Sequence, residues 1–191
     1  YANIRKANLF IEKVTASDFD EDYKNKTIAQ ARFLRGYFYK QLIDLYGGVP
    51  LITKVLDRNN DESINYPRNS YEECVAFIQQ EMEAVAEHLP STVFDGGRAT
   101  KGAALALKGQ MELYAGKWED AAETNWEIIQ SGIYDLFADY ESLFWEENEN
   151  NEEVIFDVQY VSNTRGHAIN TYWGVVESSD GFGWGAVNPT Q

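Results

Sequence analysis

Cysteine and histidine are scarce in this sequence of 191 residues. The single cysteine, Cys74, excludes an internal disulfide, and its place in a helical pattern favours a buried structural thiol. The two histidines, His88 and His167, belong to no HExxH, CxxC or CxxH spacing, so we expect no metal site. No P-loop or GxGxxG motif occurs either, and we therefore expect no cofactor.

Basic residues are also few, with 16 Lys and Arg against 31 Asp and Glu and a net charge of -15. A phosphate backbone would be repelled by this charge, so we expect no nucleic acid among the partners. An anionic lipid surface is disfavoured for the same reason. No apolar run approaches the roughly 20 residues of a membrane span. A neutral ligand such as a sugar is compatible with the charge, although the charge does not imply one.

Signals for catalysis are missing as well. Glycoside hydrolysis needs two carboxyl groups held close together, one of them with a raised pKa. The acids of this chain gather in charged runs such as Glu146-Glu147 and Glu152-Glu153, where solvent keeps carboxyl groups ionised. No G-x-S-x-G elbow occurs. We therefore name no catalytic residue and expect that the protein is not an enzyme.

What the sequence does contain is a series of helical patterns. We predict helices over 1–14, 27–46, 70–89, 100–115 and 118–131, with a connection over 19–26. The spacing of three and four residues in the second of them predicts one buried face, formed by Ile28, Ala31, Leu34, Phe38, Leu42 and Leu45. The third opens with the capping box Ser70-x-x-Glu73. Its predicted buried face consists of Val75, Ile78, Met82, Val85 and Leu89.

The last two predicted helices form a hairpin with the spacing of a tetratricopeptide repeat. Gly109, Gly116, Trp118 and Ala121 occupy the small, glycine, aromatic and alanine positions of such a repeat. Small residues at Gly109 and Ala121 would let the two helices approach closely, and Trp118 would fill the wedge at the turn. Two positions depart from the pattern, namely Glu112 in place of an aromatic residue and Ile128 in place of alanine.

The chain changes character after the last predicted helix. Residues 154–158 are short and β-branched, which predicts a strand. From residue 162 onward, aromatic residues stand among Gly, Ser and Asn without a helical period. Such rings either pin an irregular segment to the helices or stack on the apolar face of a sugar ring. On the second interpretation, the candidate ligand residues are Asn170, Tyr172, Trp173 and Trp184.

Several segments, in this order, resemble the SusD/RagB family. The two longest are ARFLRGYFY at residues 31–39 and LYGGVPL at residues 45–51. The resemblance continues through RATKGAA, LYAGKW, NEEVIF and GWG to the final PTQ, and so covers nearly the whole chain. It implies a mainly α fold of tetratricopeptide-like helical hairpins with a loop-rich, ligand-facing segment. We expect a helical scaffold over 1–136 and a loop-rich segment with a short strand over 137–191, together the central part of a longer SusD-like domain.

The resemblance also implies a function. Members of the family are non-catalytic, surface-exposed lipoproteins of the outer membrane of Gram-negative bacteria. They capture glycans, or peptides, for a SusC-like TonB-dependent transporter, and the lipid anchor would lie outside this chain. Two alternatives stay open on the sequence alone: a helical-repeat module that binds other proteins and a peptide-binding import subunit. A glycoside hydrolase fragment is a third, and it would release product from a polysaccharide.

Overall fold

The computed structural model describes residues 1–57, 59, 65–92 and 97–160. Residues 1–157 form one compact unit, which contains every helix of the described residues. The predicted helical fold is confirmed. Among the residues that the structure describes, five α-helices follow one another, and a short 3₁₀ helix (Glu146–Asn148) comes after them. The α-helices are α1 (Ala2–Thr15), α2 (Glu21–Tyr46), α3 (Tyr71–Ala86), α4 (Lys101–Tyr114) and α5 (Trp118–Gln130).

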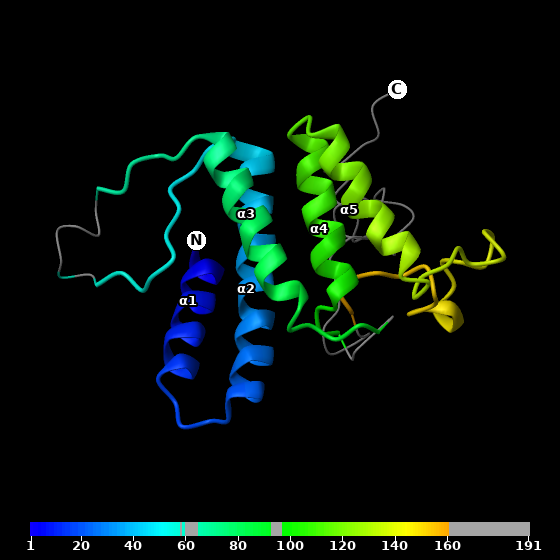
Figure 1. Cartoon of the computed structure of the whole chain (residues 1–191), viewed down its shortest axis with the longest axis horizontal. Helices are drawn as coiled ribbons and strands as arrows, with labels where there is room; N and C mark the ends of the chain where they lie inside the picture. The colour runs from blue at the N-terminus through cyan, green and yellow to red at the C-terminus, as the bar shows by residue number, and fades with distance from the viewer. Residues whose placement is uncertain (58, 60–64, 93–96, 161–191) are drawn as a thin grey trace, which may run out of the picture. The chain divides into compact units, whose positions relative to one another are not determined.

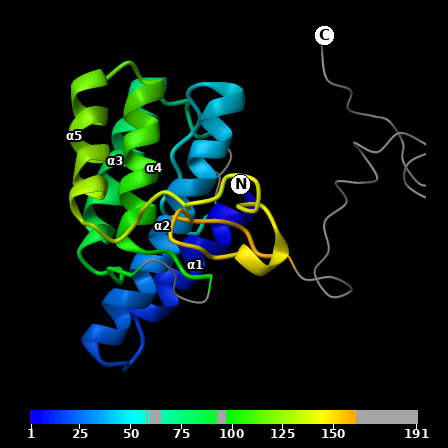
Figure 2. The same ribbon diagram turned by 90° about the vertical axis from the view of Figure 1, so that its right-hand side faces the viewer.

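Neighbouring helices run antiparallel and pack in chain order (Figure 1). Each helix contacts the next one, and α2 touches α4 as well as α1 and α3. The view turned by 90° shows α4 and α5 side by side along their length (Figure 2). The core lies mainly between α2, α3 and α4, where apolar side chains with little or no solvent exposure meet. Helical hairpins stacked in this way are the arrangement that tetratricopeptide-like sequences predict.

The predicted helix starts and stops agree with the structure at most ends. Ser70 and Glu73 form the predicted capping box, in which each side chain accepts a hydrogen bond from the other residue's backbone N–H. The Thr100 side chain caps α4 by accepting from the Ala103 N–H. Gly116 has a φ of 73°, the left-handed conformation that glycine adopts most easily at the end of a helix. These caps fix where α3 and α4 begin and where α4 ends.

The predicted connection over 19–26 is wrong for most of its length, because α2 already begins at Glu21. Asp20 caps this helix by accepting from the Tyr23 N–H at 2.9 Å. Pairs of opposite charge then follow at helical spacing, namely Lys24 with Glu21 and Lys26 with Asp22. A run of charged residues that suggested a loop therefore forms an exposed first turn with its own stabilising pairs.

The predicted buried face of α2 is also largely wrong, whereas that of α3 is confirmed. Of the six predicted positions in α2, only Ala31 is buried, and Leu45 is 76% exposed. Because α2 contacts three helices, its buried positions lie on several sides and not along one stripe. They are Ala29, Ala31, Phe33, Arg35, Gly36, Tyr39, Lys40 and Ile43.

The α4–α5 hairpin has the predicted close approach. A Cβ atom on Gly109 would lie 2.8 Å from Nδ2 of Asn125 on α5, so a larger residue would displace the Asn125 side chain. Ala121 is buried at the same interface. The prediction for Trp118 is wrong, because its side chain is 66% exposed instead of filling the wedge. Glu112, which replaces the usual aromatic residue, is buried and accepts a hydrogen bond from Gln79 at 2.9 Å.

The predicted strand over 154–158 is wrong, since none of the described residues belongs to a strand. The Val154 N–H instead closes a turn onto the Asn151 carbonyl at 3.1 Å. Two of the apolar side chains that suggested a strand, Ile155 and Phe156, pack on the helical core. Phe156 meets the Phe33 ring edge to face, with the centroids 5.1 Å apart. Its burial comes from docking on α2, and no neighbouring strand is needed to explain the pattern.

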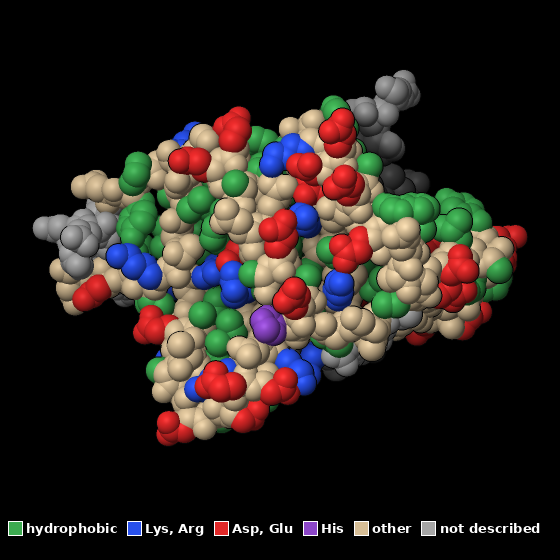
Figure 3. Space-filling view, in the orientation of Figure 1, with side chains coloured by type: hydrophobic (Ala, Val, Ile, Leu, Met, Phe, Trp, Pro, Cys, Tyr) green, Lys and Arg blue, Asp and Glu red, His purple; other side chains and the backbone are tan. Residues whose placement is uncertain are grey.

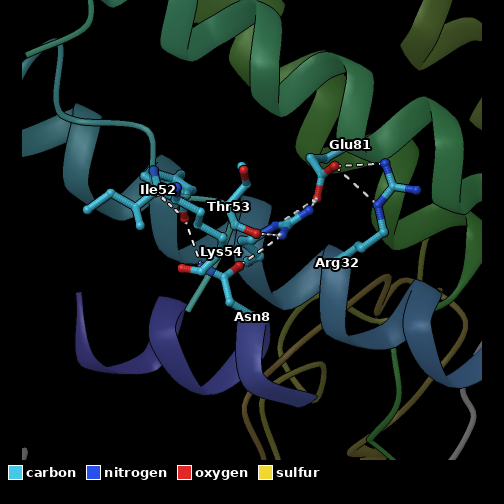
Figure 4. A network of polar contacts seen from close by, with 8 residues as sticks. Asn8, Arg32, Ile52, Thr53, Lys54 and Glu81 are labelled. Carbon is cyan, nitrogen blue, oxygen red and sulfur yellow. Dashed lines mark hydrogen bonds and ion pairs between the residues drawn. The ribbon is translucent and has the colours of Figure 1, made fainter. Parts of the chain in front are cut away.

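A buried polar network joins the first three helices (Figure 4). Each oxygen of Glu81 on α3 accepts hydrogen bonds from a different arginine of α2, with closest distances of 2.7 Å from Arg32 and 2.6 Å from Arg35. Arg35 also donates to the side chain of Asn8 on α1 at 2.9 Å. Asn8 in turn donates to the Ile52 carbonyl at 2.9 Å, which ties the segment after α2 into the same network. One carboxylate thus holds together four parts of the chain.

Cys74 is buried, as predicted for a structural thiol. Its sulfur lies 3.5 Å from the Val49 backbone nitrogen and 3.4 Å from the Val49 carbonyl oxygen. Burial raises the pKa of the thiol, so it stays protonated and unreactive at neutral pH.

The contribution of the fully buried Tyr39 to the free energy of unfolding is expected to depend on pH. Its hydroxyl accepts from the Ile52 N–H at 2.6 Å, and burial raises its pKa from 10 to about 12. Replacing it by phenylalanine leaves that N–H unsatisfied, and we expect a loss of about 1–3 kcal/mol of unfolding free energy at pH 8. Because the folded pKa is the higher one, the hydroxyl's contribution should be complete below pH 10 and fall between pH 10 and 12. Urea unfolding of both proteins from pH 8 to 12 tests this, and a difference that stays constant would contradict it.

Candidate functional site

The four candidate ligand residues from the sequence, Asn170, Tyr172, Trp173 and Trp184, lie outside the described residues. Their role stays a prediction. The described residues offer a different feature on which to build a site, a cavity of about 850 Å³ beside α1 and α2. This volume lies in the range of small-molecule pockets.

One helical stripe from each of the two helices forms the walls of this cavity. On α1, the stripe runs from Asn3 through Lys6 and Ala7 to Phe10 at three- and four-residue spacing. On α2, it runs from Tyr23 to Phe38 at the same spacing and includes Thr27, Gln30, Ala31 and Leu34. Ala31, Leu34 and Phe38 belong to the face that the sequence pattern predicted to be buried. That pattern therefore marks, over these residues, a cavity wall and not a helix–helix contact.

The third wall comes from the segment between α3 and α4. His88, Pro90, Arg98 and Ala99 line the cavity from this side. Gln30 of α2 fixes the segment, because its side chain donates to the Ala99 carbonyl at 2.8 Å and accepts from the Ala99 N–H at 2.9 Å. This pair of bonds spans 69 positions of sequence and sets the backbone next to Arg98. Phe156 completes the lining.

Two aromatic rings of the lining are accessible to solvent. Phe10 is 46% and Tyr23 is 49% exposed. Phe19 holds the Tyr23 ring by an edge-to-face contact with the centroids 5.2 Å apart. A partly exposed ring whose position is set by a neighbour can stack on a flat apolar surface, such as the C–H face of a sugar, with little further ordering.

The charge of the cavity is opposite to that of the chain. Acidic side chains are scattered over the face of the molecule shown in Figure 3, with basic ones between them. Among the described residues that line the cavity, however, there are Lys6, Lys26 and Arg98 and no aspartate or glutamate. Lys26 is paired with Asp22 at 2.7 Å, and this hydrogen bond raises the pKa of the lysine. No ion pair joins Lys6 or Arg98 to any residue that the structure describes.

A second apolar surface lies on the segment after α5. Green side chains gather at that side of the molecule in Figure 3. Leu136, Tyr140 and Phe144 are each more than three-quarters exposed, and the rings of Tyr140 and Phe144 meet edge to face at 5.9 Å. A smaller cavity of about 360 Å³ lies beside Phe144 and Trp145.

Two carboxyl groups of the described residues have shifted pKa values. A general acid for glycoside cleavage needs a raised pKa. Hydrogen bonds instead lower the pKa of Glu72, mainly through its own backbone N–H, and that of Asp139, mainly through Ser142. No group of three or more potential metal ligands occurs in the described part of the chain. Nor is any of its helices both long and apolar enough to cross a membrane.

A family model described as "Starch-binding associating with outer membrane" matches residues 1–113, which is more than half of the chain. The chain belongs to the SusD-like family. The resemblance noted in the sequence is thereby confirmed. The match covers α1, α2, α3 and all but the last residue of α4, and with them the cavity walls formed by α1, α2 and the segment before α4.

Solved structures of SusD-like proteins share this fold. A SusD-like protein from Bacteroides fragilis is 35% identical, with a TM-score of 0.80 over 98% of this chain and 38% of its own. A SusD-like carbohydrate-binding protein from the same species is 30% identical, with a TM-score of 0.85 over 97% of this chain and 36% of its own. A laminarin-binding SusD-like protein is 27% identical, with a TM-score of 0.80 over 88% of this chain and 40% of its own. The chain spans about a third of the length of the curated relatives that it matches.

The sequence alone did not point to most of the residues that line the cavity beside α1 and α2. Lys6 and Phe10 lie in the predicted helix over 1–14 without an assigned role, and Tyr23 lies in the predicted connection over 19–26. The four-residue spacing of Lys6 and Phe10 places them on one face of α1, which is the signal that could have joined them. Arg98 carries no such signal, because only the fold brings it to α1 and α2.

Proposed function

We propose that this protein is a non-catalytic glycan-binding lipoprotein on the surface of a Gram-negative outer membrane. It captures oligosaccharides and presents them to a SusC-like TonB-dependent transporter, and a lipid anchor outside this chain attaches it to the membrane. The observation that carries the proposal is membership of a family described as starch-binding and outer-membrane-associated. The names of two similar solved proteins, one carbohydrate-binding and one laminarin-binding, point to the same ligand class.

The glycan would meet two groups of residues under this proposal. The first is the exposed pair of rings at the cavity, Phe10 and Tyr23, which offer apolar stacking surfaces. The second consists of Tyr172, Trp173 and Trp184 with Asn170, in which rings would stack on sugars and the amide would bond their hydroxyl groups. Binding without turnover is the mode of action that the names of the carbohydrate-binding and laminarin-binding relatives suggest.

A second candidate function has one observation in its favour. The outer face of α5 exposes Trp118, Trp126 and Ile129, which follow one another at helical spacing. An exposed apolar stripe on the last helix of a row favours contact with another protein surface. The helical-repeat interaction module thus stays an alternative, and it predicts that sugars have no effect on the protein.

We expect polysaccharides to retard the full-length protein in native gels, and a Trp173→Ala substitution to abolish the retardation. Removing an aromatic ring that stacks on a ligand commonly costs about one to a few kcal/mol of binding free energy. The affinity for the polysaccharide should therefore fall about tenfold or more. Trp126→Ala serves as the control, because it removes a ring of the same kind from the outer face of α5.

The outcomes separate the parts of the proposal. Retardation that survives Trp173→Ala would support glycan binding but move the site away from that residue. Absence of retardation by every glycan of a broad panel would overturn the proposed function and favour a peptide or protein partner. Release of reducing ends from a retarding polysaccharide would contradict the non-catalytic role.

A further inference from the structure

The cavity beside α1 and α2 is lined by positive charge, with which a neutral sugar would form no ion pair. The chain has 31 acidic and 16 basic residues, and yet three basic and no acidic side chains are found among the described residues of the lining. Lys6 and Arg98 lack an ion-pair partner among the residues that the structure describes. Two positive charges without an ion-pair partner in the described part of the chain therefore face one cavity, in a protein whose overall field is negative.

Both charges are carried by well-anchored backbone. Lys6 lies in the middle of α1, between the buried Ile4 and Ala7 on the same helix. Arg98 directly precedes Ala99, whose N–H and carbonyl are both hydrogen-bonded to the Gln30 side chain. The two cations therefore come from elements that are 92 positions apart in sequence and that α2 holds beside the same opening. The backbone at both positions therefore needs no rearrangement for the two side chains to bind an anion.

We propose that this cavity binds an anionic sugar, that is, a glycan residue carrying a carboxylate or a sulfate ester. The inference rests on the proposed glycan-binding function and narrows its ligand class. The Phe10 and Tyr23 rings stack on the apolar C–H face of the sugar, and Lys6 and Arg98 bind its acidic group. Apolar lining residues such as Leu34 and Phe38 add surface on which the C–H groups of the sugar can pack.

The surroundings make the site selective for a small local charge. A polyphosphate or nucleic acid would carry its charge across the rest of the surface, where the net charge of -15 repels it. A single acidic group on an otherwise neutral sugar meets only the cationic lining. The acidic field outside the cavity thus restricts the ligand to a sugar whose charge can be placed between Lys6 and Arg98.

The test measures binding of the full-length protein to matched polymers by titration calorimetry and native affinity gels. One pair is a galactan in which isolated residues carry a carboxylate, compared with its methyl ester, and the other is a galactan with isolated sulfate esters, compared with its desulfated form. We expect one charged polymer to bind about tenfold or more tightly than its neutral counterpart at low salt, and the preference to shrink at 0.5 M NaCl. The two pairs distinguish a carboxylate from a sulfate ester.

The variant that tests the site is Lys6→Gln with Arg98→Gln. This double variant should lose the preference for the charged polymer. Its affinity for the neutral polymer should stay within about twofold of that of the unsubstituted protein. Lys13→Gln with Lys54→Gln is the matched control, because it changes the net charge equally at exposed positions that do not line the cavity. Both double variants change exposed side chains only, so we expect them to unfold at the same temperature as the unsubstituted protein.

Three results would overturn the inference, and they are distinguishable from failure of the proposed function. Equal binding of charged and neutral polymers would reject an anionic ligand while leaving glycan binding intact. A charge preference that the control variant lowers as much as the Lys6 and Arg98 variant would place the effect in the overall field and not in the cavity. Binding of none of the polymers, nor of any other polysaccharide, would reject the proposed function and the inference together.

Discussion

Replacing Glu81 by alanine is expected to lower the free energy of unfolding by about 3–5 kcal/mol, more than any other single substitution of a charged residue on α3. The carboxylate is 5% exposed and receives four hydrogen bonds from Arg32 and Arg35. Without it, the buried guanidinium of Arg35 keeps its charge but loses its counter-ion, because arginine does not deprotonate in proteins. Denaturant unfolding followed by circular dichroism measures the effect.

The control for this prediction lies two residues further along α3. Glu83 pairs with Lys108 at 2.9 Å, but its side chain is mostly exposed, so Glu83→Ala should cost less than about 1 kcal/mol. A second variant separates the lost interaction from a general loss of packing. Glu81→Leu combined with Arg35→Met removes both buried charges, and it should recover much of the stability that Glu81→Ala loses. If this double variant is no more stable than Glu81→Ala, an unpaired buried charge is not the reason for the loss.

The Glu81 network also shows which parts of the fold the sequence could predict. Helix starts follow from local chemistry, as at Ser70 and Thr100, where a side chain caps the backbone three residues ahead. The buried face of α3 was predictable because its apolar residues follow one stripe. Glu81, in contrast, stands between Gln80 and Met82 like any acidic residue of a helix surface. Its burial depends on two arginines 46 and 49 positions away, and such a pairing leaves no local pattern.

The same limit applies to the candidate site. Part of the cavity wall was visible in the sequence, since Ala31 and Leu34 belong to the apolar periodicity of α2. The periodicity shows that a face is apolar, but it does not show whether another helix covers it. Because Lys6 and Arg98 come from separate elements, their shared cavity follows from tertiary packing and not from spacing. The aromatic residues from 172 to 184 stay predictions on the basis of composition and resemblance.

Replacing Gly48 by alanine is expected to cost about 3 kcal/mol or more, although the residue lies outside every helix. A Cβ atom at this position would lie 2.1 Å from the Asn69 carbonyl oxygen and 2.9 Å from the Tyr71 backbone nitrogen. These are backbone atoms at the start of α3, so no rotation of a side chain can relieve the clash. The segment after α2 and the segment before α3 must therefore move apart where the Asn69 N–H donates to the Val49 carbonyl. This movement should also disturb the capping box at Ser70.

The neighbouring Gly47 provides the control, because it requires glycine for another reason. Its φ of 67° and ψ of -142° are unfavourable for other residues, but a Cβ atom there would meet nothing within 4 Å. Gly47→Ala should therefore cost about 1–3 kcal/mol through backbone strain while α3 keeps its first turn. Hydrogen exchange distinguishes the two variants, since only Gly48→Ala should reduce protection of the Glu73 and Cys74 amides, which bond to Ser70. If both variants lose stability equally and α3 stays protected, close approach of the two backbones does not explain the glycine at position 48.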